Sequence, residues 1–99
     1  MPSILHTVNQ SPFEKSCLKQ CLQQFYQGDG IILLENGVYA ALIAQPLHQA
    51  CANKTLYAIK QDIAMRGLEN KNIDSAITLI DMHDFVQLCT EYDTVLNWY

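Results

Sequence analysis

The stretch that most constrains the fold is a short apolar run at residues 31–34, which lies between glycine turn signals. Gly28 lies shortly before it and Gly37 shortly after it. Successive apolar residues without a polar interruption are typical of a strand buried on both faces. The alternative is one buried helix over residues 31–44, but Asn36 and Gly37 interrupt that pattern, and the run has the length of a strand.

Helical patterns flank this strand on both sides. Before it, Ser11 as N-cap, Pro12 at the first helical position and Glu14 completing a capping box predict a helix that begins at Pro12 and ends at the first of the glycines. After it, residues 38–52 give a weaker helical pattern that contains Pro46. Helix, strand and helix in alternation predict a parallel sheet.

The rest of the chain continues this alternation. Strands are predicted at residues 3–8, 55–59, 76–80 and, at the sheet edge, 94–99; helices are predicted at 62–66 and from Asp81 onward, the latter with Met82, Phe85, Val86 and Cys89 facing inward. The fold class is therefore α/β: a small single domain over residues 1–99 with a mainly parallel four- or five-stranded sheet flanked by helices. Functional loops are expected after the carboxyl ends of the strands, at residues 6–10, 35–37, 60–62 and 81–84.

Charge and composition exclude several classes of protein. The net charge is −4 and the six basic residues form no run, which argues against direct binding of nucleic acid. The start of the chain carries no export signal and no apolar stretch reaches membrane-spanning length, so we expect a cytoplasmic protein with no membrane contact and with reduced cysteines. With 49% hydrophobic and only 16% charged residues, part of the surface is expected to be covered by a partner; the alternative is an apolar monomer.

No cofactor or metal is expected. The loop at residues 9–12 has no glycine and places a proline where a phosphate-binding amide would lie, which argues against a flavodoxin-like flavin or nucleotide site. No serine nucleophile elbow occurs. Cys17 and Cys21 are spaced C-x3-C, but no second ligand pair lies near and the histidines are scattered, so a structural zinc site is not predicted.

The remaining reactive side chains have simple structural explanations. Asp81 and Asp84 have the arrangement of a helix start, and His83 beside them, like His6 at a strand end, is interpreted as a bystander rather than an acid or base. Cys89 is read as a small buried apolar residue.

The other three cysteines are interpreted as structural. Cys51 lies three residues from His48, a spacing that permits contact on a helix but is interpreted as chance adjacency. Cys17 and Cys21 lie on the apolar stripe of their helix, too far from its start for the helix dipole to activate a thiol, and spacing alone makes them core residues.

Several short segments of the sequence resemble those of the DsrH/TusB family of sulfur-relay proteins, within the DsrE/DsrF/DsrH-like superfamily. They are LHTVNQSPF at 5–13, GVYAAL at 37–42, DIAMRG at 62–67, ID with DFVQL at 80–88, and DTV with Trp98 at 93–98. Each segment alone is weak. Together they occur in the family's order and at its separations, nearly end to end.

The resemblance implies a small α/β subunit of a heterohexamer, a dimer of heterotrimers with TusC/DsrF-like and TusD/DsrE-like partners. Such a complex passes sulfur as a cysteine persulfide to a TusE/DsrC-like carrier. The sulfur ends in tRNA wobble-uridine 2-thiolation in the Tus branch and in dissimilatory sulfur oxidation in the Dsr branch. The wording at residues 3–9 and 93–95 leans to the DsrH side, but sequence leaves the branch open. The chain is expected to fold poorly or self-associate without its partners.

The principal sulfur-bearing cysteine of such complexes belongs to the TusD/DsrE-like subunit. In this chain the resemblance singles out Cys21, where DsrH-like members also carry a cysteine, as the candidate persulfide or relay residue of a sulfurtransferase complex. Its position on an apolar stripe speaks for packing instead. The alternatives are a non-catalytic subunit that scaffolds the sulfur-carrying partner, and a small flavodoxin-like redox protein.

Overall fold

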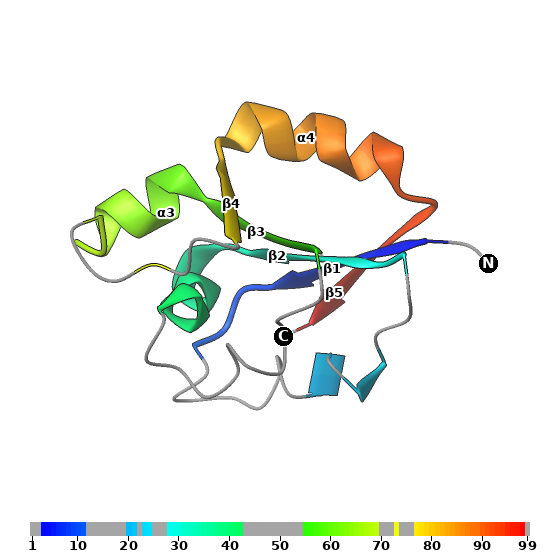
Figure 1. The fold of residues 1–99 in the computed structure, drawn as a ribbon, viewed down its shortest axis with the longest axis horizontal. Coiled ribbons are helices and arrows are strands. Elements are labelled where there is room, and N and C mark those ends of the chain that lie inside the picture. Colours follow the sequence, from blue (N-terminus) through cyan, green and yellow to red (C-terminus); the bar gives the residue numbers. More distant parts are fainter. Residues whose placement is uncertain are drawn as a thin grey trace.

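The computed structural model describes residues 3–11, 20–21, 23–24, 28–42, 55–69, 73 and 77–98. Its elements are β1 (Ile4–Val8), β2 (Gly30–Leu33), the 3-10 helix η1 (Glu35–Ala41), β3 (Thr55–Ile59), α3 (Lys60–Met65), β4 (Ile77–Ile80), α4 (Met82–Glu91) and β5 (Thr94–Trp98). The strands form one five-stranded sheet in the order β4-β3-β2-β1-β5, and every neighbouring pair is parallel (Figure 1). The predicted α/β class and parallel sheet are confirmed.

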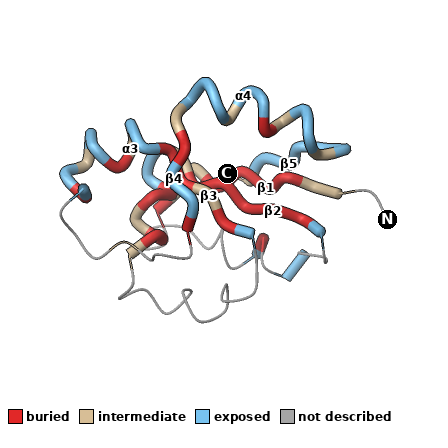
Figure 2. The backbone as a smooth tube through the Cα atoms, turned by 45° about the horizontal axis from the view of Figure 1, so that its top comes forward, coloured by how far each residue is buried: buried red, intermediate tan, exposed pale blue. Residues whose placement is uncertain are grey.

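The apolar run between the glycines is the central strand of the sheet. All four residues of β2 are buried, as Figure 2 shows in red. Gly28 has φ +95°, a left-handed conformation that suits glycine. The predicted helix from Pro12 lies for the most part outside the described residues.

The direction of each connection decides which face its helix covers. From β1 to β4 the chain moves one strand at a time toward the same edge, and between β4 and β5 it returns to the far side of β1. Right-handed crossovers in opposite directions place their helices on opposite faces. Accordingly, η1 and α4 lie on opposite sides of the sheet in Figure 1.

Each face of the sheet has its own apolar cluster. The first includes Val38 of η1 and Ile63 of α3, packed with Ile31 and Leu33 of β2. The second includes Leu88 of α4, packed with Leu5, Ile32, Ile59 and Ile80. Neighbouring residues of β2 therefore point to opposite clusters, which explains why the run has no polar position.

Two helices begin earlier than the sequence predicted. Helix structure after β2 was expected from Val38, but η1 begins at Glu35 and is a 3-10 helix up to Ala41; residues 43–52 lie outside the description. The Asp62 carboxylate accepts the Glu35 N–H at 2.8 Å, which satisfies a donor at the start of η1. Helix α3 begins at Lys60 rather than at Asp62.

The prediction of which α4 residues face inward was partly wrong. Met82 and Val86 are 45% and 64% exposed, while Leu88 is buried and Phe85 and Cys89 are half-buried against the second cluster. Positions 82, 85, 86 and 89 form a helical stripe, but so do 85, 88, 89 and 92, and periodicity alone does not choose between them. The second stripe faces the sheet because it carries Leu88 and the ring of Tyr92.

Two glycines provide a test of how tightly the elements meet. A Cβ at Gly37 would collide with the backbone carbonyl of Val8, whereas one at Gly30 would collide with the hydroxyl end of the Tyr92 side chain. We expect Gly37→Ala to lower the free energy of unfolding by about 1–3 kcal/mol, since backbone cannot move aside. Gly30→Ala should cost less because the tyrosine ring can turn. Urea unfolding of both variants measures this, and an equal or smaller loss for Gly37→Ala would contradict it.

Candidate functional site

The candidate relay residue Cys21 is completely buried in the chain. Its exposed fraction is 0%, and it belongs to the first apolar cluster together with Val8 and Ile31. Its backbone carbonyl accepts the Gln24 N–H at 2.9 Å in a helical turn. The inward placement predicted from helical spacing is therefore confirmed, and the sulfur is not reachable from solvent in this arrangement.

Among the other cysteines, only Cys89 is described. Cys17, Cys51 and the neighbouring His48 lie outside the described residues. Cys89 is half-buried on α4, and burial raises the pKa of its thiol. Because the thiolate is the reactive form, a raised pKa makes Cys89 a poor nucleophile at neutral pH.

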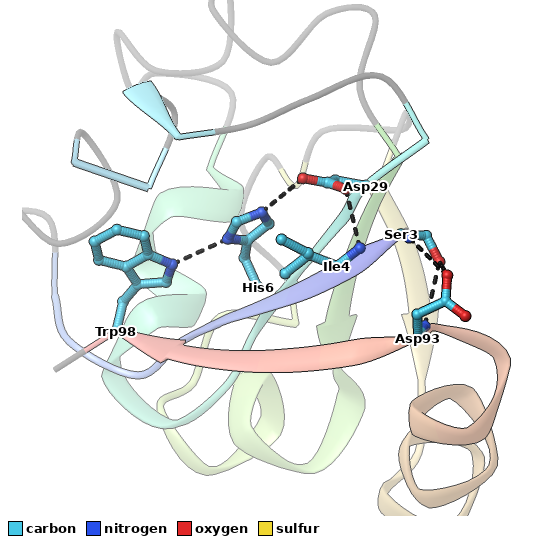
Figure 3. Close-up of polar contacts among 6 residues, drawn as sticks. All are labelled: Ser3, Ile4, His6, Asp29, Asp93 and Trp98. Atoms are coloured by element: carbon cyan, nitrogen blue, oxygen red, sulfur yellow. Dashed lines mark hydrogen bonds and ion pairs between the residues drawn. The ribbon is translucent and has the colours of Figure 1, made fainter. Parts of the chain in front are cut away.

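A buried polar chain of His6, Asp29 and Trp98 crosses the face of the sheet (Figure 3). The His6 Nε2 lies 3.0 Å from the Asp29 Oδ2, and their side chains are 0% and 1% exposed. The Trp98 indole N–H donates to the His6 Nδ1 at 3.1 Å, and the two rings are stacked at an interplanar angle of 27°. Three strands are thereby linked, since His6 lies on β1, Trp98 on β5 and Asp29 directly before β2.

The partners of His6 fix its tautomer. An indole N–H only donates, so the His6 Nδ1 accepts, and the ring proton of this tautomer lies on Nε2, where it donates to the Asp29 carboxylate. Both ring nitrogens are thus engaged. The arrangement holds strands together and presents neither a lone pair nor a proton to a substrate.

The amino ends of the strands are joined by two aspartates. The other oxygen of Asp29, Oδ1, accepts the Ile4 N–H at 3.0 Å. Asp93, directly before β5, accepts the Ser3 N–H at 2.8 Å (Figure 3). The Ser3 carbonyl accepts the Thr94 N–H at 3.1 Å. The start of β1 is therefore held on both sides.

Sequence reasoning missed this polar chain. His6 was placed at a strand end, but it is the third residue of β1 and is buried, so that interpretation was wrong. The signal available in the sequence was the alternation of side chains along a strand. It places His6 on the same face as the apolar Val8, and a buried histidine on such a face needs a polar partner.

At the carboxyl edge of the sheet, polar side chains of neighbouring segments bind one another. Arg66 donates from Nε to the Asn36 Oδ1 at 2.9 Å and lies 3.6 Å from the Asp62 carboxylate. These contacts join η1 to α3. Glu35, at φ +50°, is in the left-handed region, which for a residue with a side chain is a strained conformation that these contacts hold in place.

The carboxylate of Asp81 at the start of α4 is structural, as predicted. The Asp81 side chain accepts the Asp84 N–H at 2.8 Å as the N-cap of the helix. His83, beside them, is exposed. Within the described ranges, no group of three or more His, Cys, Asp or Glu side chains lies close enough to hold a metal ion.

Residues of the described part of the chain line two surface hollows. One, of about 280 Å³, lies beside α4 and is lined by Tyr57, Ile80, Asp84, Gln87, Leu88 and Glu91. The other, of about 260 Å³, is lined by Lys60, Ile63, Glu69, Ile73 and Leu79. Neither hollow is lined by a cysteine. In the parts of the chain that are described, no helix is long and apolar enough to cross a membrane.

Comparison with known proteins identifies close sequence relatives and a shared fold. The family model of the DsrH-like proteins matches residues 10–95. Protein TusB of Pectobacterium atrosepticum is 34% identical over 97 residues, which cover 96% of this chain and 100% of the relative. Protein TusB of Escherichia coli K12 is 32% identical with the same coverage.

Solved structures with much lower identity share the fold. The ychN protein of Escherichia coli superimposes with a TM-score of 0.82 at 18% identity, covering 99% of this chain and 100% of the other. A protein of unknown function from Methanobacterium thermoautotrophicum gives a TM-score of 0.77 at 8% identity, covering 98% and 99%. The fold thus persists where most side chains differ.

The buried polar chain can be tested with Asp29→Asn. The amide offers one oxygen and one NH2 group, so either the Ile4 N–H or the His6 N–H meets a donor in place of an acceptor. We expect a loss of about 1–3 kcal/mol in the free energy of unfolding. The control is Glu69→Gln, at an exposed position outside the helices and strands, which should change it by less than about 0.5 kcal/mol. Equal effects of the two variants would contradict the assigned role.

The thiol of Cys89 gives a second prediction. Because burial raises its pKa, alkylation of Cys89 should be slow at neutral pH and should accelerate only at higher pH than for an ordinary thiol. A cysteine introduced by Val86→Cys, at a 64% exposed position of the same helix, serves as the matched control. Peptide mapping after timed alkylation measures both. Equal alkylation rates at the two positions would show that burial does not lower the reactivity of the Cys89 thiol.

Proposed function

The chain belongs to the DsrH/TusB family, and on that premise we propose that it is a subunit of a sulfur-relay complex that serves tRNA thiolation. The observation that carries the proposal is the match to proteins named TusB, which extends over 96% of this chain and the whole length of each relative. The family model of the DsrH-like proteins matches the same region. Family membership supports a sulfur-relay role.

The proposed complex is a heterohexamer of the TusBCD type, in which this chain lies beside TusC-like and TusD-like subunits in the cytoplasm. Its surface supports the presence of partners. Apolar side chains project from several elements, among them Met65 at 80%, Val86 at 64% and Met82 at 45% exposed. A charge-poor domain with such side chains gains by covering them with another subunit.

The names of the relatives also help to choose between tRNA thiolation and sulfur oxidation. Eight curated relatives at 31–35% identity are named TusB, which favours delivery of sulfur to tRNA over sulfur oxidation. The wording at the two ends of the chain leaned to the DsrH side, but such short segments weigh less than identity over the whole length.

The proposed role within the complex is to scaffold the sulfur-carrying partner. A persulfide carrier must expose a thiolate to its donor and its acceptor. Cys21 has 0% exposure among apolar side chains, and burial raises the pKa of Cys89. Both observations support a persulfide-bearing cysteine on the TusD-like subunit rather than on either of the two cysteines that the structure describes.

Complementation tests the cellular role. In an Escherichia coli strain that lacks its own TusB, expression of this chain should restore 2-thiouridine at the tRNA wobble position, measured by mass spectrometry of digested tRNA. Because the chain has to engage the host's partner subunits, co-purification of those subunits is measured in parallel. Co-purification without restored thiolation would contradict the assignment to tRNA thiolation.

The role of Cys21 is tested by Cys21→Ala in the assembled complex, with Cys89→Ala as control. Alanine removes the sulfur and leaves a small apolar side chain in the core. If the chain is a scaffold, both variants should assemble and pass sulfur at the parental rate. An assembled Cys21→Ala complex that has lost sulfur transfer would assign the relay role to Cys21.

A further inference from the structure

We propose that the hollow beside α4 receives an arginine side chain of the TusC-like or TusD-like subunit in the assembled complex. The hollow, of about 280 Å³, is lined by Tyr57 of β3, Ile80 of β4 and four residues of α4, which are Asp84, Gln87, Leu88 and Glu91. The inference rests on the proposed function, because it requires those subunits, and it names a surface that one of them covers.

The hollow combines apolar and acidic side chains. Ile80 and Leu88 are 9% and 8% exposed and supply an apolar base. Asp84 and Glu91 are exposed and lie about two helical turns apart, so they are on the same side of α4. Among the described residues, neither carboxylate is hydrogen-bonded or ion-paired. The hollow thus offers two unpaired anions next to an apolar surface.

The volume of the hollow suits one long side chain. Sites for small molecules and cofactors occupy about 300–1,000 Å³, which is more than this hollow provides. An arginine has an apolar stem that can cover Ile80 and Leu88, and a planar guanidinium whose five N–H donors match the carboxylate and amide oxygens around the hollow. Tyr57 adds an aromatic ring, with which a guanidinium also interacts favourably. A lysine offers a point charge without this fork of donors.

The distribution of charge along the chain favours a cationic occupant. Residues 72–99 contain five acidic residues and no lysine or arginine, whereas residues 1–71 contain five acidic and six basic ones. The formal charges of the two parts are therefore −5 and +1, which sum to the −4 of the chain. Four of the five acids lie on α4 or next to its ends: Asp81, Asp84, Glu91 and Asp93. Such a surface attracts a basic partner and repels nucleic acid.

A second copy of this chain is not the source of the arginine. The sequence contains a single arginine, Arg66. Its guanidinium is engaged within the chain, where Nε donates to the Asn36 Oδ1 at 2.9 Å and Nη1 donates to the Asp62 carbonyl at 3.2 Å. Two copies that met through α4 would also bring like charges together. The arginine therefore comes from a different protein.

Exposed apolar side chains on α4 favour a resident subunit over a carrier that leaves after each transfer. Met82 and Val86, one turn apart, are 45% and 64% exposed, and Figure 2 shows most of the helix in pale blue. Lasting interfaces are more hydrophobic than transient ones. A subunit that lies across α4 covers both this pair and the hollow.

Charge reversal in the assembled complex tests the contact. Glu91→Lys places a cation at the hollow, and because Glu91 is the last residue of α4, a cation there suits the helix dipole and should not impair folding. The control Glu69→Lys makes the same change of charge at an exposed position away from this hollow. When a tagged chain is co-expressed with both partner subunits, Glu91→Lys should hold them at least about tenfold more weakly than wild type, and Glu69→Lys as firmly as wild type. Equal retention by the two variants would overturn the inference.

Arginine modification with phenylglyoxal, mapped by mass spectrometry, identifies the partner residue. One arginine of the TusC-like or TusD-like subunit should be protected in the wild-type complex and should react in the Glu91→Lys complex. Replacing that arginine by glutamate should weaken assembly, and combining this change with Glu91→Lys should restore it, which a misfolded variant would not do.

Two outcomes separate this inference from the proposed function. An assembled complex without a protected arginine on either subunit, or with protection only when the downstream carrier is added, would overturn the inference and leave the complex intact. A wild-type chain that captures neither subunit would contradict the proposed complex together with the inference.

Discussion

Every strand of the sheet runs parallel to its neighbours, and the rest of the structure follows from that constraint. Parallel neighbours require a crossover between consecutive strands, and a crossover covers one face of the sheet. Because the chain reverses direction after β4, its last crossover covers the other face with α4. Both faces are then buried, which is why β2 is apolar at all four positions.

The same reversal makes β5 dependent on tertiary contacts. The strand arrives next to β1, about ninety residues away in sequence, and forms the sheet edge. It is held by polar groups as well as by the strand ladder: Asp93 binds Ser3 at one end, and the Trp98 indole binds His6 at the other. His6 is fixed in turn by Asp29 at the start of the central strand. Polar satisfaction thus orients an edge strand that has few apolar contacts of its own.

Local sequence signals predicted much of this fold. The glycines around residues 31–34 identified the central strand, and the Asp81 cap identified the start of α4. Prediction failed where two local patterns were equally good, as for Met82 and Val86 against Leu88 and Tyr92 on α4. It failed also where contacts distant in sequence decide, as for Asp62 at the start of η1 and Asp29 beside His6. No local sequence pattern predicts hydrogen-bond partners that lie far apart in the chain.

At the candidate site, too, the sequence predicted local placement but not function. Helical spacing predicted that Cys21 faces inward, and it is buried beside Val8 and Ile31. Whether a buried thiol takes part in sulfur transfer depends on the assembled complex, because neighbouring subunits can change its access and its charge environment.

The proposed scaffold role is tested most directly by loading the assembled complex with a persulfide donor and mapping the added sulfur by mass spectrometry of intact subunits and peptides. The account predicts an added sulfur on the TusD-like subunit and none on Cys21 or Cys89 of this chain. An added sulfur on Cys21 that is chased from the complex by the downstream carrier would contradict it.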